Sequence, residues 1–340
     1  MSENMTAYGF EGSEEKNGSI QFEKRSIEKP APNNREILVE VKAVALNPTD
    51  VMTWKMKKAD DTSFTVLGRD VSGTVVEVGD DVTLFKVGDD VFYPGTSNVQ
   101  GAQADYHLID ERMVALKPKN LNFAEAAALP LTALTAYETF YDQLTIPKNS
   151  EEKPLLLIVG AAGGVGSIAT QIALNDGIDV IGTASRDESR EHLRSLGVKK
   201  IIDHKKPYEP QLKEFGINSV DYIFLAANAD YNIKEVSKIV SARGHVCSIL
   251  PLSEALPMSF FSKSVSFNYE LMYTRSVYKT EDWIQQHNYL DELRKEVEAG
   301  NIHSTINHRY EEITEQTLSE AYDQLMTGHT NGKIVLEHTV

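Results

Sequence analysis

Three evenly spaced glycines are the strongest chemical signal in this 340-residue chain. Gly160, Gly163 and Gly166 follow directly on residues 155–159, an apolar run with the length of one buried strand. Beyond them, residues 167–174 carry apolar side chains at helical spacing. A strand, a tight glycine turn and a helix form a cradle in which the backbone can approach a pyrophosphate and the helix N-terminus offers free N–H groups. The pattern therefore predicts a nucleotide-binding turn.

A glycine triplet alone would be weak evidence, since glycines also allow a helix to pack closely on a strand. Here the strand and the helix flank the glycines in the required order, which favours the nucleotide-binding interpretation. The turn residues that we expect to contact the cofactor are Gly160, Gly163, Gly164, Val165 and Gly166.

The residues after the next predicted strand, 179–183, indicate which dinucleotide is bound. Folds that prefer NAD place a carboxylate about 20 residues beyond the glycines, whereas NADP-binding folds place cations there. Ser185 can donate a hydroxyl hydrogen bond and Arg186 a charge-assisted pair to a 2′-phosphate. Asp187 is a carboxylate at this point, and we expect it to be the N-cap of the following helix. The sequence predicts a preference for NADPH.

Alternating strands and helices must position these residues. After the glycine turn, strands are predicted at residues 179–183, 200–203, 222–225, 245–249 and 265–272, with segments of helical length between them. One such helix is predicted over residues 187–196 and is stopped by Gly197. Strands that alternate with helices make a parallel, doubly wound sheet, so the fold class is α/β.

The first third of the chain has a different sequence pattern. Residues 36–45 alternate charged and apolar side chains, as a half-exposed strand does, and residues 73–79 and 85–92 continue as short strands broken by glycine turns. This pattern predicts a compact region resembling a β-barrel. The alanine-rich stretch 123–140 is predicted to be helical, with Pro130 bending or dividing it.

Both chain ends contribute to the β-rich region in the predicted layout. Residues 281–299 have the pattern of an amphipathic helix and residues 332–336 that of a last strand. We expect one discontinuous domain, residues 1–128 and 275–340, with the nucleotide-binding domain, residues 129–274, inserted between its parts.

Composition narrows the function classes. The single cysteine, Cys247, excludes an intramolecular disulfide and a thiolate zinc cluster, and it suits a reducing cytoplasm. A net charge of −16 disfavours nucleic acid and anionic lipid as partners. Residues 1–6 lack the basic start and apolar core of a signal peptide, and no apolar run has membrane-spanning length. These features predict a cytoplasmic enzyme with a small-molecule substrate.

Five segments in order carry a resemblance to a known family. They are residues 45–50 (ALNPTD), 67–73 (LGRDVSG), 85–89 (FKVGD), 128–136 (ALPLTALTA) and the glycine turn. Over nearly its whole length the chain resembles the medium-chain dehydrogenase/reductase superfamily. It is most similar there to the zinc-free quinone oxidoreductase, or zeta-crystallin-like, branch, with a subgroup labelled zinc-type alcohol dehydrogenase-like. The resemblance implies a GroES-like β-barrel domain, a Rossmann domain and a homodimer joined through the edge strands of the Rossmann sheets.

The resemblance also allows the zinc label to be tested. Zinc alcohol dehydrogenases bind the catalytic metal with a cysteine where this chain has Asn47, and with a His–Glu pair where it has Arg69 and Asp70. A third ligand, again cysteine, would fall within residues 131–135, where there is none. Zinc needs several thiolate, imidazole or carboxylate donors that converge on one point. We therefore expect no metal.

Without a Lewis acid, oxidation of an alcohol lacks a group that deprotonates the substrate. Hydride transfer from NADPH to an electron-poor acceptor stays feasible, because the arriving charge delocalises onto an oxygen atom. The expected function is zinc-independent reduction of quinones or α,β-unsaturated carbonyl compounds. The alternative is an NADPH-binding redox-sensing or structural protein with little turnover, as some zeta-crystallin-like relatives suggest.

The resemblance implies two residues beside the nicotinamide. Asn47 and Thr132 match positions that family members place there, and the amide of Asn47 could donate a hydrogen bond to the substrate oxygen. A local role, capping the turn formed by residues 48–50, is equally consistent for Asn47. His204 falls where relatives place an aromatic residue near the adenosine phosphate.

Three further residues invite catalytic assignments. For Arg69, an ion pair with Asp50 or Asp70 is favoured over an electrophilic role. Tyr93 and Tyr137 could donate protons, although a tyrosine at such positions is more often a packing residue with a satisfied hydroxyl.

Overall fold

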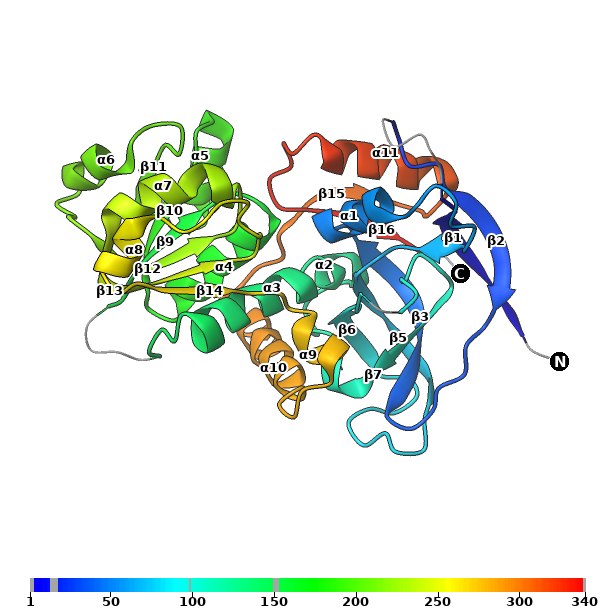
Figure 1. The fold of residues 1–340 in the computed structure, drawn as a ribbon. Coiled ribbons are helices and arrows are strands. Elements are labelled where there is room, and N and C mark those ends of the chain that lie inside the picture. Colours follow the sequence, from blue (N-terminus) through cyan, green and yellow to red (C-terminus); the bar gives the residue numbers. More distant parts are fainter. Residues whose placement is uncertain (1–2, 13–17, 98, 149–152, 339–340) are drawn as a thin grey trace. The chain divides into compact units, whose positions relative to one another are not determined.

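The computed structural model describes residues 3–12, 18–97, 99–148 and 153–338, and the chain divides into two compact units (Figure 1). The first, here called the GroES-like unit, comprises Met1–Leu131, Tyr273–Gly300 and Ser304–Val340. The second, the Rossmann unit, comprises Thr132–Met272 and Asn301–His303. The domain boundaries expected from the sequence lie within a few residues of these limits, apart from residues 301–303.

The Rossmann unit contains a six-stranded parallel sheet with the strand order β11-β10-β9-β12-β13-β14. The strands are β9 (Leu155–Val159), β10 (Asp179–Thr183), β11 (Lys200–Ile202), β12 (Val220–Leu225), β13 (Val240–Ser248) and β14 (Ser266–Tyr269). The order runs outward in both directions from β9, which confirms the predicted doubly wound sheet. In such sheets, ligands bind outside the carboxyl ends of the strands where the order reverses.

Helices alternate with these strands along the chain. They are α4 (Gly164–Asn175), α5 (Asp187–Ser195), α6 (Tyr208–Glu214), α7 (Ala229–Ile239) and α8 (Met258–Ser262). The central strands are apolar on both faces because helices cover them, and Leu157, Ile223 and Val246 are fully buried in this core.

The alanine-rich stretch is divided as predicted. It forms α2 (Phe123–Ala127) and α3 (Pro130–Tyr137), and α3 continues into a π-helical turn over Glu138–Gln143. Pro130 is the first residue of α3, a position where proline's missing N–H costs no helical hydrogen bond.

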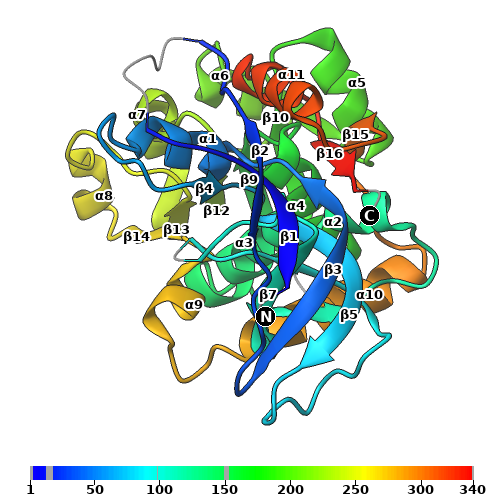
Figure 2. The ribbon, with the colours of Figure 1, turned by 90° about the vertical axis from the view of Figure 1, so that its right-hand side faces the viewer.

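The GroES-like unit contains two sheets. The larger has the order β15-β16-β3-β5-β6-β8, with β7 also paired to β3, and the smaller has the order β2-β1-β4 (Figure 2). Their strands are β1 (Asn4–Phe10), β2 (Glu23–Glu28), β3 (Glu36–Ala45), β4 (Thr65–Val66), β5 (Asp70–Val78), β6 (Asp90–Pro94), β7 (Tyr106–Asp110), β8 (Ala115–Leu116), β15 (Ile306–Tyr310) and β16 (Lys333–Glu337). Because β16 pairs antiparallel with β3, both ends of the chain build this unit.

Short helices complete the GroES-like unit. They are α1 (Pro48–Met56), a 3₁₀ turn over Glu111–Met113, α9 (Thr274–Tyr278), α10 (Gln285–Glu298) and α11 (Glu315–Met326). No helix in the described ranges has both the length and the apolar character needed to cross a membrane.

The prediction of a strand over residues 85–92 is wrong for the first part of this segment. Residues 85–89 form a loop, and β6 begins only at Asp90. The carboxylate of Asp89 accepts the backbone N–H of Lys86 at 3.0 Å, and Gly88 adopts a φ of +92°. A side chain that caps its own turn competes with strand pairing.

Candidate functional site

Different surroundings explain why glycine occupies each of the three positions of the turn. A Cβ on Gly160, whose φ is +83°, would lie 2.6 Å from Cβ of Ala227. A Cβ on Gly166 would lie 2.2 Å from the carbonyl oxygen of Gly160, so α4 packs directly on the turn. A Cβ on Gly163 would meet that oxygen at 3.4 Å, an ordinary contact, with no closer neighbour. Packing excludes a side chain at Gly160 and Gly166, whereas Gly163 keeps accessible space clear.

Helix α4 begins at this clear space. Gly163 is its N-cap, no side chain caps the helix, and its first turn holds no acidic residue. The first N–H groups of a helix have no acceptor within it, which leaves those of Gly164, Val165 and Gly166 to bind an anion. The hydroxyl of Thr183 accepts the N–H of Gly160 at 3.0 Å and ties the turn to β10. The structure thus brings all five predicted turn residues together in a cradle that fits a pyrophosphate.

Ser185 and Arg186 follow the carboxyl end of β10, and both are partly buried. Arg186 is the N-cap of α5 and Asp187 its first residue, so the prediction that Asp187 is the N-cap is wrong by one position. As an exposed residue of the first turn, Asp187 instead interacts favourably with the positive end of the helix dipole.

His204 lies at the same edge of the sheet. It follows β11, which pairs in parallel with β10 so that Ile202 is opposite Thr183. Burial lowers the pKa of His204, and the charges of Lys205 and Arg190 lower it further against the opposing effect of Asp203. Arg190 is therefore close enough to act on His204. The sequence analysis missed Arg190, which lies one turn after the N-cap Arg186.

In the GroES-like unit, a buried network surrounds Asn47. The ammonium of Lys333 donates to Oδ1 of Asn47 at 2.6 Å, to Oδ2 of Asp70 at 2.8 Å and to the carbonyl oxygen of Leu46 at 2.8 Å. Nδ2 of Asn47 donates to Oδ2 of Asp70 at 3.0 Å, and Oδ1 of Asp70 accepts the N–H of Leu131 at 2.7 Å. The Asn47 amide is thus held within this network, and the exposed fraction of Lys333 is only 3%.

Asn47 also occupies the N-cap position of α1. Its backbone N–H donates to Oδ2 of Asp50 at 2.9 Å, while Oδ1 of Asp50 accepts the N–H of Gly68 at 3.2 Å. Burial raises the pKa of Asp50 to about 6, against the lowering effects of Arg69 and of these hydrogen bonds. Asp50 therefore joins the start of α1 to the segment that carries Arg69 and Asp70.

The predicted ion pair of Arg69 with Asp50 or Asp70 is not what the structure contains. Arg69 is buried, and its Nη1 donates to the carbonyl oxygens of Thr96 and, at 2.9 Å, Val99. Its positive charge still lowers the pKa of Asp50. Arg69 holds a loop in place, and carbonyl oxygens replace the expected carboxylate because that loop, from a distant part of the sequence, folds over the guanidinium.

Zinc does not fit the residues at these positions. The ammonium of Lys333 already binds both Asn47 and Asp70, and the guanidinium of Arg69 has no lone pair for a metal. Cys247 is buried in β13, and burial raises the pKa of its thiol to about 12, which disfavours the thiolate that zinc requires. Within the described ranges, no three His, Cys, Asp or Glu side chains come together as a metal site would need.

The other candidate residues are buried. Thr132 is in the first turn of α3 with an exposed fraction of 2%. Tyr93 is fully buried, its hydroxyl lies 3.2 Å from Nδ1 of His107, and burial raises its pKa. Tyr137 is 1% exposed. Burial of this kind supports packing roles for the two tyrosines.

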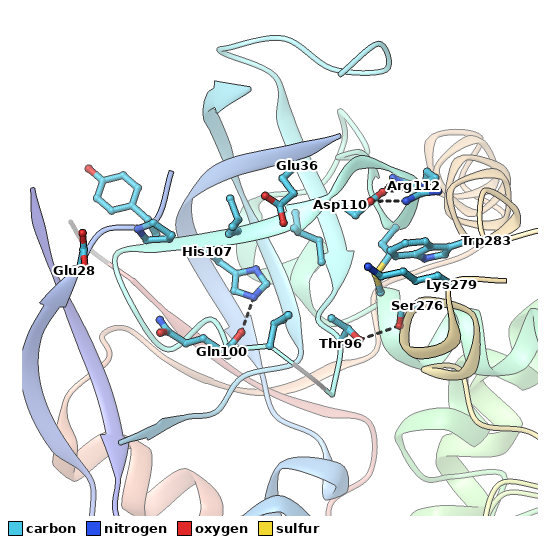
Figure 3. Close-up of a pocket in the computed structure, with 16 residues that line it drawn as sticks. Glu28, Glu36, Thr96, Gln100, His107, Asp110, Arg112, Ser276, Lys279 and Trp283 are labelled. Atoms are coloured by element: carbon cyan, nitrogen blue, oxygen red, sulfur yellow. Dashed lines mark hydrogen bonds and ion pairs between the residues drawn. The ribbon is translucent and has the colours of Figure 1, made fainter. Parts of the chain in front are cut away.

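A cavity of about 350 Å³ lies within the GroES-like unit, along β7 (Figure 3). Figure 3 shows His107 between Glu28 at one end and Trp283 and Lys279 at the other. Thr96 and Val99, whose carbonyl groups hold Arg69, also line it. None of the site residues predicted from the sequence does.

His107 gives this unit a pH-dependent stability. Burial lowers the pKa of His107 to about 4, and its ring stacks on Tyr93. Because the folded pKa lies below the ordinary value of 6.5, the neutral ring stabilises the fold above about pH 6.5, and that contribution is lost as the pH falls towards 4. From about pH 7.5 to about pH 5, we expect the unfolding free energy to fall by about 2 kcal/mol more than in His107→Gln. Denaturant unfolding at both pH values measures this, and parallel losses in the two proteins would contradict it.

Sequence comparisons place the chain in a family. The family model described as "Alcohol dehydrogenase GroES-like domain" matches residues 33–119, and that described as "Zinc-binding dehydrogenase" matches residues 164–290. A zinc-type alcohol dehydrogenase-like protein of Staphylococcus aureus is 40% identical over 91% of this chain and 92% of its own length. A 2-methylene-furan-3-one reductase of Solanum lycopersicum is 31% identical over 94% of this chain and 76% of its own length.

Comparisons with solved structures point to the same family. A Rhizobium etli protein whose name places it among zinc-dependent alcohol dehydrogenases matches with a TM-score of 0.94 and 38% identity over 100% of both chains. A quinone oxidoreductase of Pseudomonas syringae matches with a TM-score of 0.80 and 26% identity over 98% of this chain and 99% of its own. Together with the two sheets and the glycine turn, these matches show that the chain belongs to the medium-chain dehydrogenase/reductase superfamily, in its quinone oxidoreductase-like branch.

Proposed function

We propose that this oxidoreductase is an NADPH-dependent reductase of quinones or α,β-unsaturated carbonyl compounds that works without zinc. The observation that carries the proposal is the glycine turn, in which Gly163 leaves space for a pyrophosphate at the uncapped start of α4. NADPH would supply the hydride, and the protein would bind it through this turn.

The charges beside the turn support NADPH over NADH. Ser185 and Arg186 follow β10, and His204 follows β11 at the same sheet edge. Arg190 is close enough to lower the pKa of His204, and Arg186 precedes it at the start of α5, so cationic side chains are present where we propose that the 2′-phosphate lies. Guanidinium groups suit phosphate because their donors match its oxygens.

The substrate class follows from the polar network. Lys333 and Asp70 are bound to each other and to Asn47, so these side chains do not offer a metal the donor atoms with which it could polarise an unactivated alcohol. An acceptor must therefore delocalise the arriving charge itself, as quinones and enones do. The tomato relative, named for reduction of a methylene-furanone, supports an enone. We propose that Asn47 and Thr132 face the nicotinamide, with Asn47 fixed in orientation by Lys333.

Turnover decides between this proposal and an NADPH-binding sensor or structural protein. We expect steady NADPH consumption when quinones or enones are added to the purified protein, and no reduction of NADP⁺ by ethanol. The rate should rise with the electrophilicity of the acceptor. Tight NADPH binding without turnover across an electrophile series would favour the sensor, and robust ethanol oxidation would contradict the mechanism.

Arg186→Ala tests the cofactor assignment. The side chain is partly exposed, so the strength of its charge-assisted bond to the 2′-phosphate should be at the lower end of the usual range. We therefore expect NADPH binding to weaken by about tenfold. NADH binding should hardly change, since NADH has no phosphate at that position. Titration of each cofactor by fluorescence measures this. Equal weakening for both would show that Arg186 acts on the fold instead.

We also propose a homodimer formed through the outer edge of β14. This strand ends the six-stranded sheet, and near it Tyr269, Leu271 and Phe261 are 53%, 56% and 81% exposed. Exposed apolar side chains beside an unpaired strand edge suit pairing with a second copy. Light scattering that gives the mass of a monomer at micromolar concentration would contradict this proposal.

A further inference from the structure

A hydrogen bond joins two helices of the Rossmann unit. The hydroxyl oxygen of Ser167, fully buried in the first turn of α4, lies 2.8 Å from Nε2 of His192 on α5. The two residues are 25 positions apart in the sequence. Neither is part of the glycine pattern or of the residues expected at the 2′-phosphate.

The same hydroxyl holds the phosphate-binding turn. Ser167 donates to the carbonyl oxygen of Ala162 at 3.2 Å, and the N–H of Gly163, from the same peptide group, donates to the carbonyl oxygen of Gly160 at 3.1 Å. That peptide plane is therefore fixed at both ends. A serine hydroxyl has one hydrogen, so its donation to Ala162 leaves its lone pairs to accept an N–H from His192. His192 thus supports the hydroxyl that orients the turn.

His192 lies on the helix that carries the proposed 2′-phosphate residues. Arg186 caps α5, and Arg190 follows one turn later, with its N–H bonded to the carbonyl oxygen of Arg186 at 3.0 Å. Leu193, next to His192, is fully buried, and a Cβ on Gly182 of β10 would come within 2.9 Å of it. Arg186 and His192 therefore lie on one helix, and that helix packs closely on β10 through Leu193.

We infer that His192 is a positioning residue that couples the 2′-phosphate end of α5 to the pyrophosphate turn through Ser167. The inference rests on the proposed NADPH cofactor. NADPH contacts both elements, so it gains from their being held in register before binding. NADH lacks the phosphate that engages α5, so the connection contributes less to its affinity.

Cofactor titrations of His192 variants test the coupling. In His192→Leu, we expect NADPH to bind about three- to tenfold more weakly, as loss of one hydrogen bond implies, with NADH changed by no more than about twofold. His192→Gln should restore NADPH binding, because its side-chain amide N–H reaches about as far from Cβ as Nε2–H of histidine. Ser167→Ala also removes the bond to Ala162, so it should weaken NADPH binding at least as much, and combining it with His192→Leu should add nothing further. If His192→Leu does not fold, His192→Ala, which removes the ring without adding a branched side chain, takes its place.

Glu191→Ala is the matched control. Glu191 is exposed on the same helix, pairs with Arg194 at 3.2 Å, and should leave both affinities unchanged. The inference is overturned if NADPH and NADH weaken equally in His192→Leu, if glutamine fails to restore binding, or if the two losses add. A wild-type protein that binds NADPH no tighter than NADH overturns the cofactor proposal together with this coupling. A wild type that prefers NADPH, with the preference intact in His192→Leu, overturns the coupling alone.

Discussion

Lys333→Met is expected to lower the free energy of unfolding by about 3–5 kcal/mol, because it leaves the buried carboxylate of Asp70 without its counter-charge. Lys333 and Asp70 are 3% and 0% exposed and lie 2.8 Å apart, so water cannot replace the lost ammonium. Oδ1 of Asn47 would lose its donor as well. Guanidinium denaturation of the variant and the wild type measures the difference.

Two further variants give this prediction its controls. Lys295→Met removes an ammonium that pairs with Asp291 at the same 2.8 Å distance but is 64% exposed, and it should cost less than about 1 kcal/mol. Lys333→Met combined with Asp70→Asn removes both charges and should recover part of the loss, since an amide can bond to Asn47. A loss in Lys333→Met no larger than in Lys295→Met would mean that the buried pair does not hold this region together.

Gly163→Val is expected to weaken NADPH binding by about a hundredfold while leaving the unfolding midpoint almost unchanged. The backbone of Gly163 has φ −75° and ψ 179°, which a β-branched residue adopts readily, and its Cβ would meet nothing closer than 3.4 Å. The added side chain would instead fill the space beside the uncapped N–H groups of α4. Calorimetric titration with NADPH and thermal unfolding measure the two effects.

Gly166→Ala is the matched comparison. Its Cβ would lie 2.2 Å from the carbonyl oxygen of Gly160 and 2.5 Å from Cα of Ala161, so the backbone itself must shift. We expect this variant to lower the unfolding midpoint, with cofactor binding lost as a consequence. Unchanged NADPH affinity in Gly163→Val would show that the space beside Gly163 is not the pyrophosphate site.

Local patterns explain why much of the fold could be predicted. The strand at Leu155–Val159 is an uninterrupted apolar run, and α5 begins at the predicted residue and ends at Ser195, one residue before the predicted end. Pro130 divides the alanine-rich stretch because its ring has no N–H to donate. A glycine turn was predicted within residues 85–92, but not a loop that takes up all of residues 85–89, because the bond from Lys86 to Asp89 competes with strand pairing and leaves no mark in the apolar pattern.

The residues of the candidate site also fall into those that local sequence patterns predict and those that they do not. The glycine turn and Ser185–Arg186 could be proposed as a cofactor site because their spacing relative to one strand is fixed by the strand–turn–helix unit. Arg190 was missed, although the helical period would have found it. Lys333 could not be found in this way, since a lysine within a strand pattern predicts an exposed side chain, not one that is 3% exposed.

The sequence by itself determined the elements, the glycine turn and the cationic segment after β10, because each depends on residues close together in the chain. Only the tertiary structure decided the partners of the buried charges. Lys333 meets Asp70 across 263 positions and Arg69 meets Val99 across 30, and pairings over such separations follow from strand order and loop closure, which no local pattern encodes. The same holds for the bond between Ser167 and His192, which exists because the fold brings the first turn of α4 within hydrogen-bond reach of α5.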